Sequence, residues 1–190
     1  PKAQVAPLST AIFKIPGYRV YMNFDPDRPS LGSSGLRGIC IYVKEHIKGQ
    51  PISFSHLRSV ETLWLSLSLR GSDTLHLGCL YRSPSSSLQE STAEVCNLLR
   101  EASDSASHVL LAGDFNYPSI CWNTLTSPMP SDHPTNQFLD SLSDCFLHQH
   151  VDQPTRYRDG SRPSTLDLVI TNEEGMIGSV EYLPGISNSD

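Results

Sequence analysis

Apolar and polar residues alternate along several short stretches of the chain, which is the pattern expected of half-buried β-strands. The stretch 18–24 alternates, 38–43 is an apolar run of β-forming residues, 60–69 alternates again, and 74–81 follows as a fourth predicted strand. In the third stretch Leu63, Leu65 and Leu67 face one way, and serine and threonine are among the residues between them. Gly71-Ser72 is a turn signal before the fourth stretch, so we predict that these two strands form a hairpin.

Two later segments show helical spacing instead. Ser87 and Glu90 have the spacing of a capping box, and the stripe that follows them is Val95, Leu98, Leu99 and Ala102. We predict that Thr135 caps a second helix, whose stripe is Phe138, Leu139, Leu142, Cys145 and Phe146. Further strands are predicted at 108–115, 165–171 and 177–182. Hairpins interrupted by two helices favour mixed sheets with covering helices over a regular βαβ series.

Composition narrows the class of protein. A length of 190 residues with 38% hydrophobic residues suffices for one domain with a sizeable core, and we treat 1–190 as a single domain. The formal net charge of −6 counts against tight nonspecific binding of nucleic acid. It does not exclude a nuclease, because such an enzyme can gather carboxylates around a divalent metal that supplies local positive charge.

The cysteines and the hydropathy pattern bear on where the protein works. The five cysteines are odd in number and widely spaced, which favours reduced thiols in an intracellular protein over a disulfide framework. The sequence contains no run of about 18 apolar residues, so we expect no membrane span.

The sharpest chemical feature is the run 110–116, in which a buried strand delivers Asp114 and Asn116 to its carboxyl end. Strand periodicity would point both side chains the same way. A carboxylate can hold a metal or take a proton from water, and a neutral amide beside it can donate to a phosphoryl oxygen. The alternative is a strand that simply ends in residues favoured in turns.

Two other residues are candidates for the same site. Asp167 lies in the apolar run 165–171, where a buried carboxylate needs a partner such as a histidine or a metal. The alternative is an edge-strand aspartate that faces solvent. Tyr81 ends a strand, and its phenol could contact a phosphate, although a tyrosine of the core or its rim would look the same.

Five short motifs stand in an order typical of one family. They are Tyr81-Arg82-Ser83-Pro84, Leu111-Ala112-Gly113-Asp114-Phe115-Asn116, Pro154-Thr155-Arg156, Ser164-Thr165-Leu166-Asp167 and Ser189-Asp190. In this order they resemble the endonuclease/exonuclease/phosphatase superfamily, and more closely the apurinic-like endonuclease domain of non-LTR (LINE-type) retrotransposons. The stretches 117–122 and 168–172 are also typical of those elements, and the resemblance runs from about residue 12 to the end.

The resemblance implies a fold and a set of roles. The fold is an α/β (α+β) four-layer αββα sandwich, DNase-I-like, with two mixed β-sheets flanked by helices. Asp114 would orient or deprotonate the attacking water, Asn116 would bind the scissile phosphate, and Tyr81 would stabilise charge on the phosphoryl oxygens. Asp167 would orient a catalytic histidine, Asp190 would help hold the metal, and Thr155 would touch the DNA backbone. The metal would be Mg²⁺ or Mn²⁺, which prefer hard oxygen ligands.

The sequence departs from the family's pattern at both ends. The family's Asn and metal-binding Glu come from two strands that would precede this chain, and Glu61 opens a later strand. The family's catalytic histidine directly follows the Ser-Asp pair, where this chain stops at Asp190. Where the family often has Asn or a second Pro, this chain has Ser83-Pro84-Ser85. We therefore expect an incomplete domain, with little or no activity in these 190 residues alone.

Three functions follow from these observations. The first is a DNA-nicking endonuclease that acts in the nucleus and supports target-primed reverse transcription by a reverse transcriptase in the same polyprotein. The second keeps the fold and acts on inositol phosphates or another small phosphate ester. The third is a degenerate copy without catalysis, which the absent Glu and His favour and the retained carboxylates oppose.

Overall fold

The computed structural model describes residues 14–24, 38–54, 57–157, 160 and 162–183. Its elements are β1 (Tyr18–Phe24), β2 (Gly38–Lys44), β3 (Gly49–Ile52), β4 (Val60–Ser68), β5 (Thr74–Arg82), α1 (Leu88–Ser105), β6 (His108–Asp114), α2 (Pro134–Asp144), β7 (His148–Gln149), β8 (Asp167–Thr171) and the 3-10 helix η2 (Glu174–Met176). No helix in the described part is long and apolar enough to cross a membrane.

The strands form two sheets. In the larger sheet six strands run in the order β3-β4-β5-β6-β8-β7, and β1 pairs with β2 in a separate antiparallel sheet. The predicted hairpin of β4 and β5 is confirmed as an antiparallel pair. Among the described strands of the larger sheet, β5 and β6 are the one parallel pair, and α1 is the crossover between them, as a parallel connection requires.

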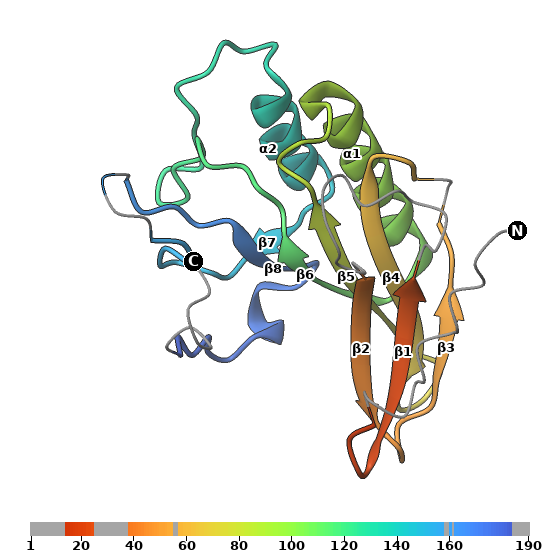
Figure 1. The fold of residues 1–190 in the computed structure, drawn as a ribbon. Coiled ribbons are helices and arrows are strands. Elements are labelled where there is room, and N and C mark those ends of the chain that lie inside the picture. The colour runs from red at the N-terminus through yellow and green to blue at the C-terminus, as the bar shows by residue number, and fades with distance from the viewer. Residues whose placement is uncertain (1–13, 25–37, 55–56, 158–159, 161, 184–190) are drawn as a thin grey trace, which may run out of the picture.

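Alternate residues of the larger sheet pack against different layers. One face carries Trp64, Leu80 and Leu111 and is covered by α1 and α2, whose buried residues join them in the main core. The other face packs against the β1–β2 sheet, where Leu65, Leu67 and Val43 form a second cluster. Figure 1 shows the two helices side by side on one face and β1 and β2 in front of the other. The predicted fold class is confirmed, and the described residues form three layers, one helical and two of strands.

The first helix matches its prediction closely. The Ser87 side chain accepts a hydrogen bond from the Glu90 backbone N–H at 3.4 Å and caps α1. The predicted stripe is buried throughout: Val95, Leu98, Leu99 and Ala102 are at most 1% exposed.

The predicted cap of the second helix is wrong by two residues. The capping residue is His133, whose Nδ1 accepts from the Thr135 backbone N–H at 3.2 Å. Pro134 occupies the first helical position, where a missing N–H costs nothing, so the helix begins before Thr135. Phe146 is also not part of the apolar stripe, because α2 ends at Asp144 and leaves this ring 81% exposed.

The strand predicted at 177–182 is absent from the described residues, which include no sheet partner for it. Instead, the Tyr182 hydroxyl accepts from the backbone N–H groups of Asp152 and Gln153 and donates to the Asp152 carboxylate. The short strands β3 and β7 were not predicted, since neither has a full alternating run.

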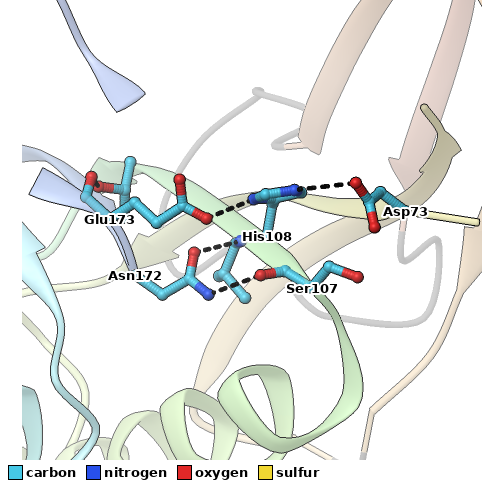
Figure 2. Close-up of polar contacts among 7 residues, drawn as sticks. Asp73, Ser107, His108, Asn172 and Glu173 are labelled. Carbon is cyan, nitrogen blue, oxygen red and sulfur yellow. Dashed lines mark hydrogen bonds and ion pairs between the residues drawn. The ribbon is translucent and has the colours of Figure 1, made fainter. Parts of the chain in front are cut away.

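One end of the larger sheet is closed by a polar cluster. His108, which opens β6, lies 2.6 Å from Glu173 through Nδ1 and 4.0 Å from Asp73 through Nε2. The Asn172 side chain accepts from the Val109 N–H and donates to the Ser107 carbonyl. Figure 2 shows these side chains converging from the turn before β5, the start of β6 and the end of β8. Asp114 is at the opposite end of β6, so this cluster is distinct from the candidate site.

Candidate active site

Three of the candidate residues lie in one row across neighbouring strands. Tyr81 of β5 is the register partner of Asp114 of β6, and Asp114 is the partner of Asp167 of β8. Directly paired residues point to the same face of a sheet. The row lies on the face that packs against the β1–β2 sheet, because Leu77 and Leu75 of β5 point there too. Glu61 of β4 pairs with Tyr81 and continues the row.

The chain leaves the end of β6 in an unusual conformation. Gly113 has a φ of +150°, and a Cβ built on it would lie 1.9 Å from the Leu80 carbonyl oxygen. Asn116 takes a left-handed φ of 54°, although it is not glycine. Between them, the Phe115 N–H donates to the Leu166 carbonyl at 2.8 Å and extends the pairing with the segment before β8. This geometry brings Asn116 back toward the sheet.

The prediction that Asp114 and Asn116 share a side was right in outcome and wrong in reason. β6 ends at Asp114, so strand periodicity does not reach Asn116. The left-handed conformation of Asn116 turns its side chain to the cleft instead. There the Asn116 side-chain amide donates to the Arg82 carbonyl at 2.8 Å. Asn116 is 6% exposed, so this amide is held in place and not free in solvent.

These side chains border one cleft of about 350 Å³ at the carboxyl ends of β5 and β6. Five of the six candidate residues line it: Tyr81, Asp114, Asn116, Thr155 and Asp167. The sixth, Asp190, lies outside the described residues. Pro84, Arg156 and Leu166 complete the lining. Arg156 had no predicted role, although it stands in the Pro154-Thr155-Arg156 motif and brings the cleft a cation.

The Asp114 carboxylate is under electrostatic strain. Burial raises the pKa of Asp114 above its ordinary value, and the negative charge of Asp167 raises it further. Hydrogen bonds from Asn116 and the charge of Arg156 act in the opposite direction. The Asp114 Oδ1 atom is buried without a hydrogen-bond partner among the described residues. A buried carboxylate oxygen in this state calls for a cation or a proton donor.

Asp167 differs from its prediction. It is the exposed first residue of β8 and not a buried residue within the strand. The apolar run that suggested burial begins at Leu168, and the residues before Asp167 are outside the strand. The Thr155 hydroxyl holds the backbone at the start of β8, because its Oγ1 accepts from the backbone N–H groups of Leu166 and Asp167, each at 3.1 Å. With its oxygen used in this way, the Thr155 hydroxyl can still donate its proton into the cleft.

The donor set suits a hard divalent cation in part. Asp114 and Asp167 offer carboxylate oxygens at neighbouring positions, and the unpartnered Asp114 Oδ1 fits a cation nearby. Within the described ranges, no group of three or more His, Cys, Asp or Glu residues could hold a metal. Any such site therefore needs a further ligand from outside those residues, from substrate or from water.

Comparison with solved structures shows the fold. The endonuclease domain of TRAS1, a telomere-specific non-LTR retrotransposon, superimposes with a TM-score of 0.52 at 16% identity, covering 82% of this chain and 65% of that one. An endonuclease/exonuclease/phosphatase family protein from Leptotrichia buccalis gives 0.52 at 13% identity, covering 82% and 60%. The catalytic domain of Xenopus laevis APE2 gives 0.51 at 13% identity, covering 85% and 68%.

The chain thus spans about two-thirds or less of the length of these structures. No curated protein matches its sequence. Residues 75–190 match the model of a family described as endonuclease-reverse transcriptase. This match covers more than half of the chain and includes every residue that lines the cleft. The chain therefore belongs to the endonuclease-reverse transcriptase family, and its fold is that of endonuclease/exonuclease/phosphatase domains.

Proposed function

We propose that the chain is the metal-dependent endonuclease domain of a non-LTR retrotransposon polyprotein, and that it nicks DNA by hydrolysing one phosphodiester bond. The observation that carries the proposal is the meeting of Tyr81, Asp114, Asn116 and Asp167 around one cleft. They come from three neighbouring strands and the turn after the middle one. A phenol, an amide and two carboxylates there can bind a phosphate and activate water.

Each residue has a distinct part in this proposal. Asp114 orients the attacking water and accepts its proton, because its unpartnered oxygen leaves it able to do so. The fixed Asn116 amide and the Tyr81 phenol donate to the phosphoryl oxygens as negative charge develops there. Asp167 orients a catalytic histidine, and Thr155 donates its hydroxyl proton to the DNA backbone.

A divalent cation, Mg²⁺ or Mn²⁺, is the proposed cofactor. It would be held by Asp190 together with carboxylate oxygens of the cleft. When bound, such a cation neutralises charge on the scissile phosphate. Without it, a cleft that carries Asp114 and Asp167 would repel a phosphodiester, since Arg156 is the one cation among the lining residues of the described part.

The wider role follows from the family. We propose that the nick supplies a 3′ hydroxyl for a reverse transcriptase in the same polyprotein, and that the protein acts on nuclear DNA. Both are suggested by the family's description as endonuclease-reverse transcriptase and by the likeness to the endonuclease domain of a retrotransposon.

The direct test is nicking of supercoiled plasmid in Mg²⁺, read as conversion to the open circular form. It is run on the chain and on a polypeptide that includes any flanking residues its gene encodes. Asp114→Ala should lower the rate at least about 100-fold, the usual scale of general acid–base catalysis. Asp104→Ala is the matched control, because this exposed aspartate is at the end of α1 and away from the cleft.

The outcomes separate the three functions. Nicking that is abolished by EDTA and by Asp114→Ala, and kept by Asp104→Ala, supports the endonuclease. Hydrolysis of an inositol phosphate without nicking would replace DNA with a small substrate in the same cleft. A folded polypeptide that carries the flanking residues and hydrolyses neither substrate overturns the proposal and makes the chain a non-catalytic copy, whereas a silent 190-residue chain beside an active longer one is the expected result.

A further inference from the structure

Arg82 ends β5 directly after Tyr81, yet its side chain takes the opposite direction. Successive residues of a strand point to opposite faces, so Tyr81 borders the cleft while Arg82 enters the helix-covered side. Its side chain is 3% exposed, which is rare for arginine. A buried guanidinium is costly unless its N–H groups are paired, so its contacts need an explanation.

Those contacts converge on the turn after β6. Arg82 donates through Nε to the Phe115 carbonyl at 2.7 Å and through Nη2 to the Asn116 carbonyl. Its Nη1 donates to Ser91 Oγ of α1 at 3.4 Å. The guanidinium therefore holds two successive carbonyls, at the point where the chain leaves the sheet and takes its left-handed turn.

The same turn binds back to Arg82. The Asn116 side-chain amide donates to the Arg82 carbonyl at 2.8 Å, so the two residues hold each other through side chain and backbone. The Tyr117 ring lies under the guanidinium, with 4.4 Å between the ring centroid and Cζ. Tyr117 is itself fixed by a 2.9 Å bond between its hydroxyl and Thr92 Oγ1 of α1.

These mutual contacts of Arg82 with the turn at 115–116, called the clamp below, hold the Asn116 backbone at the edge of the cleft. Asparagine is one of the few residues besides glycine that adopt the left-handed region, so its residue type permits the Asn116 conformation and its surroundings must select it. The fork of Arg82 can satisfy both carbonyls at once, because Nε and Nη2 have fixed directions. Lysine would keep the charge but has a single nitrogen with no such fork.

We infer that Arg82 is a positioning residue, which sets the Asn116 amide and the Asp114 carboxylate for catalysis by gripping the backbone of the turn that joins them to the core. The inference deepens the proposed function and rests on it. Arg82 does not line the cleft and acts through the Phe115 and Asn116 carbonyls.

The test compares Arg82→Lys with two controls. Arg100→Lys makes the same exchange on the exposed face of α1, and Leu142→Ala removes core packing through α2 but none of the contacts of Arg82. For Arg82→Lys, kcat for nicking should fall roughly 10- to 100-fold per folded molecule, with KM changed less than about threefold, as for a displaced catalytic group. Both controls should keep kcat at a temperature where they are folded.

A second readout does not depend on activity. The Asn116 side-chain amide gives its own NMR signals, and its bond to the Arg82 carbonyl should slow hydrogen exchange. Arg82→Lys should shift these signals and speed their exchange, whereas Leu142→Ala should leave their positions unchanged. The kinetic comparison uses the polypeptide that carries the flanking residues. If its wild-type form does not cleave DNA, the proposed function fails, and this NMR readout still decides whether Arg82 positions Asn116.

Two results would overturn the inference. One is a folded Arg82→Lys protein with unchanged kcat or unchanged Asn116 amide signals. If Arg82→Lys does not fold, the wild-type protein is used instead, and the hydrogen-exchange rates of the Arg82 Nε–H and the Asn116 side-chain amide are measured at increasing denaturant. Both groups bond Arg82 to the turn at 115–116, so they should open together, and the same dependence on denaturant supports the inference. Different dependences are the second result that would overturn it.

Discussion

The Asp114 carboxylate lies between groups with opposite effects on its ionisation. Burial and the charge of Asp167 raise its pKa, while Asn116 and Arg156 lower it. As the proposed base, Asp114 must be ionised, so activity should rise with pH as the solution passes through its raised pKa. The charges of Asp167 and Arg156 thereby help to set the pH at which the nicking rate begins to fall on the acid side.

Exchanges of the two charged neighbours should move the Asp114 pKa in opposite directions. Asp167→Asn removes a negative charge and should lower the pKa, whereas Arg156→Gln removes a positive charge and should raise it. The measurement is a ¹³C NMR titration of the Asp114 carboxyl carbon, with the acid limb of the nicking rate beside it. Shifts of the same sign in both variants would contradict this account of the site.

Gly113 is the residue whose replacement should disturb the site most through the backbone. Gly113→Ala would bring Cβ to 1.9 Å from the Leu80 carbonyl oxygen at a φ of +150°, so the strands must separate. We expect a loss of about 3–5 kcal/mol in the free energy of unfolding, measured with denaturant. Gly71→Ala is the control: at a φ of +75° with nothing within 4 Å, it should lose only about 1 kcal/mol. Equal losses would show that the close approach at Leu80 does not matter.

At the scale of elements, the end of α2 shows how a helix can stop without glycine. The Phe146 N–H donates to the Ser143 carbonyl and the Leu147 N–H to the Leu142 carbonyl, which is the Schellman arrangement. Phe146 occupies the left-handed position of this motif, with a φ of 53° and a ring that is 81% exposed. This left-handed position favours glycine, and the exposed phenylalanine ring buries little apolar surface that could offset the strain.

Phe146→Gly should therefore stabilise the protein. Removing the Cβ relieves the left-handed strain, and the greater flexibility of glycine in the unfolded chain offsets part of the gain. We expect the free energy of unfolding to rise by about 0.5–1 kcal/mol. Phe146→Ala keeps the Cβ and should not gain. A destabilised glycine variant would mean that the exposed ring makes a contact that matters.

The elements also show which predictions sequence patterns support. The strands around Tyr81 and Asp114 and the stripe of α1 were predicted because alternation and helical spacing report local burial. The cap at His133 was missed, because Thr135 is a better cap by residue type and only the proline between them moves the helix start. The predicted strand at 177–182 contains residues typical of strands, but a strand needs a partner, and residue type does not report one.

The candidate site was partly predictable. The strand ends and the motif order pointed to residues that do line one cleft, but the left-handed turn that brings Asn116 there was not predicted, because such a turn leaves no periodic signal. The contacts of Arg82 with the Phe115 and Asn116 carbonyls were also beyond prediction. They join residues more than 30 positions apart and depend on how two strands end beside each other.

At the scale of the whole molecule, the larger sheet carries the candidate cleft at one end and a polar cluster at the other. The cleft is at the carboxyl end of β6, and the cluster around His108 is at its amino end. This cluster fastens the turn between β4 and β5 and the end of β8 to the start of β6 (Figure 2). It should govern stability without altering the reaction.

Asn172→Ala tests this separation. The change leaves the Val109 N–H and the Ser107 carbonyl without the side-chain partners that now bond them at 2.8 and 3.1 Å. Since Val109 is only 2% exposed, water reaches its N–H poorly, and we expect a loss of about 1–3 kcal/mol in the free energy of unfolding. The Asp114 carboxyl titration should match that of the wild-type protein, because the two ends share no side chain. If Asn172→Ala shifted the Asp114 pKa while the protein stayed folded, β6 would transmit strain along its length, and the two ends would form one coupled unit.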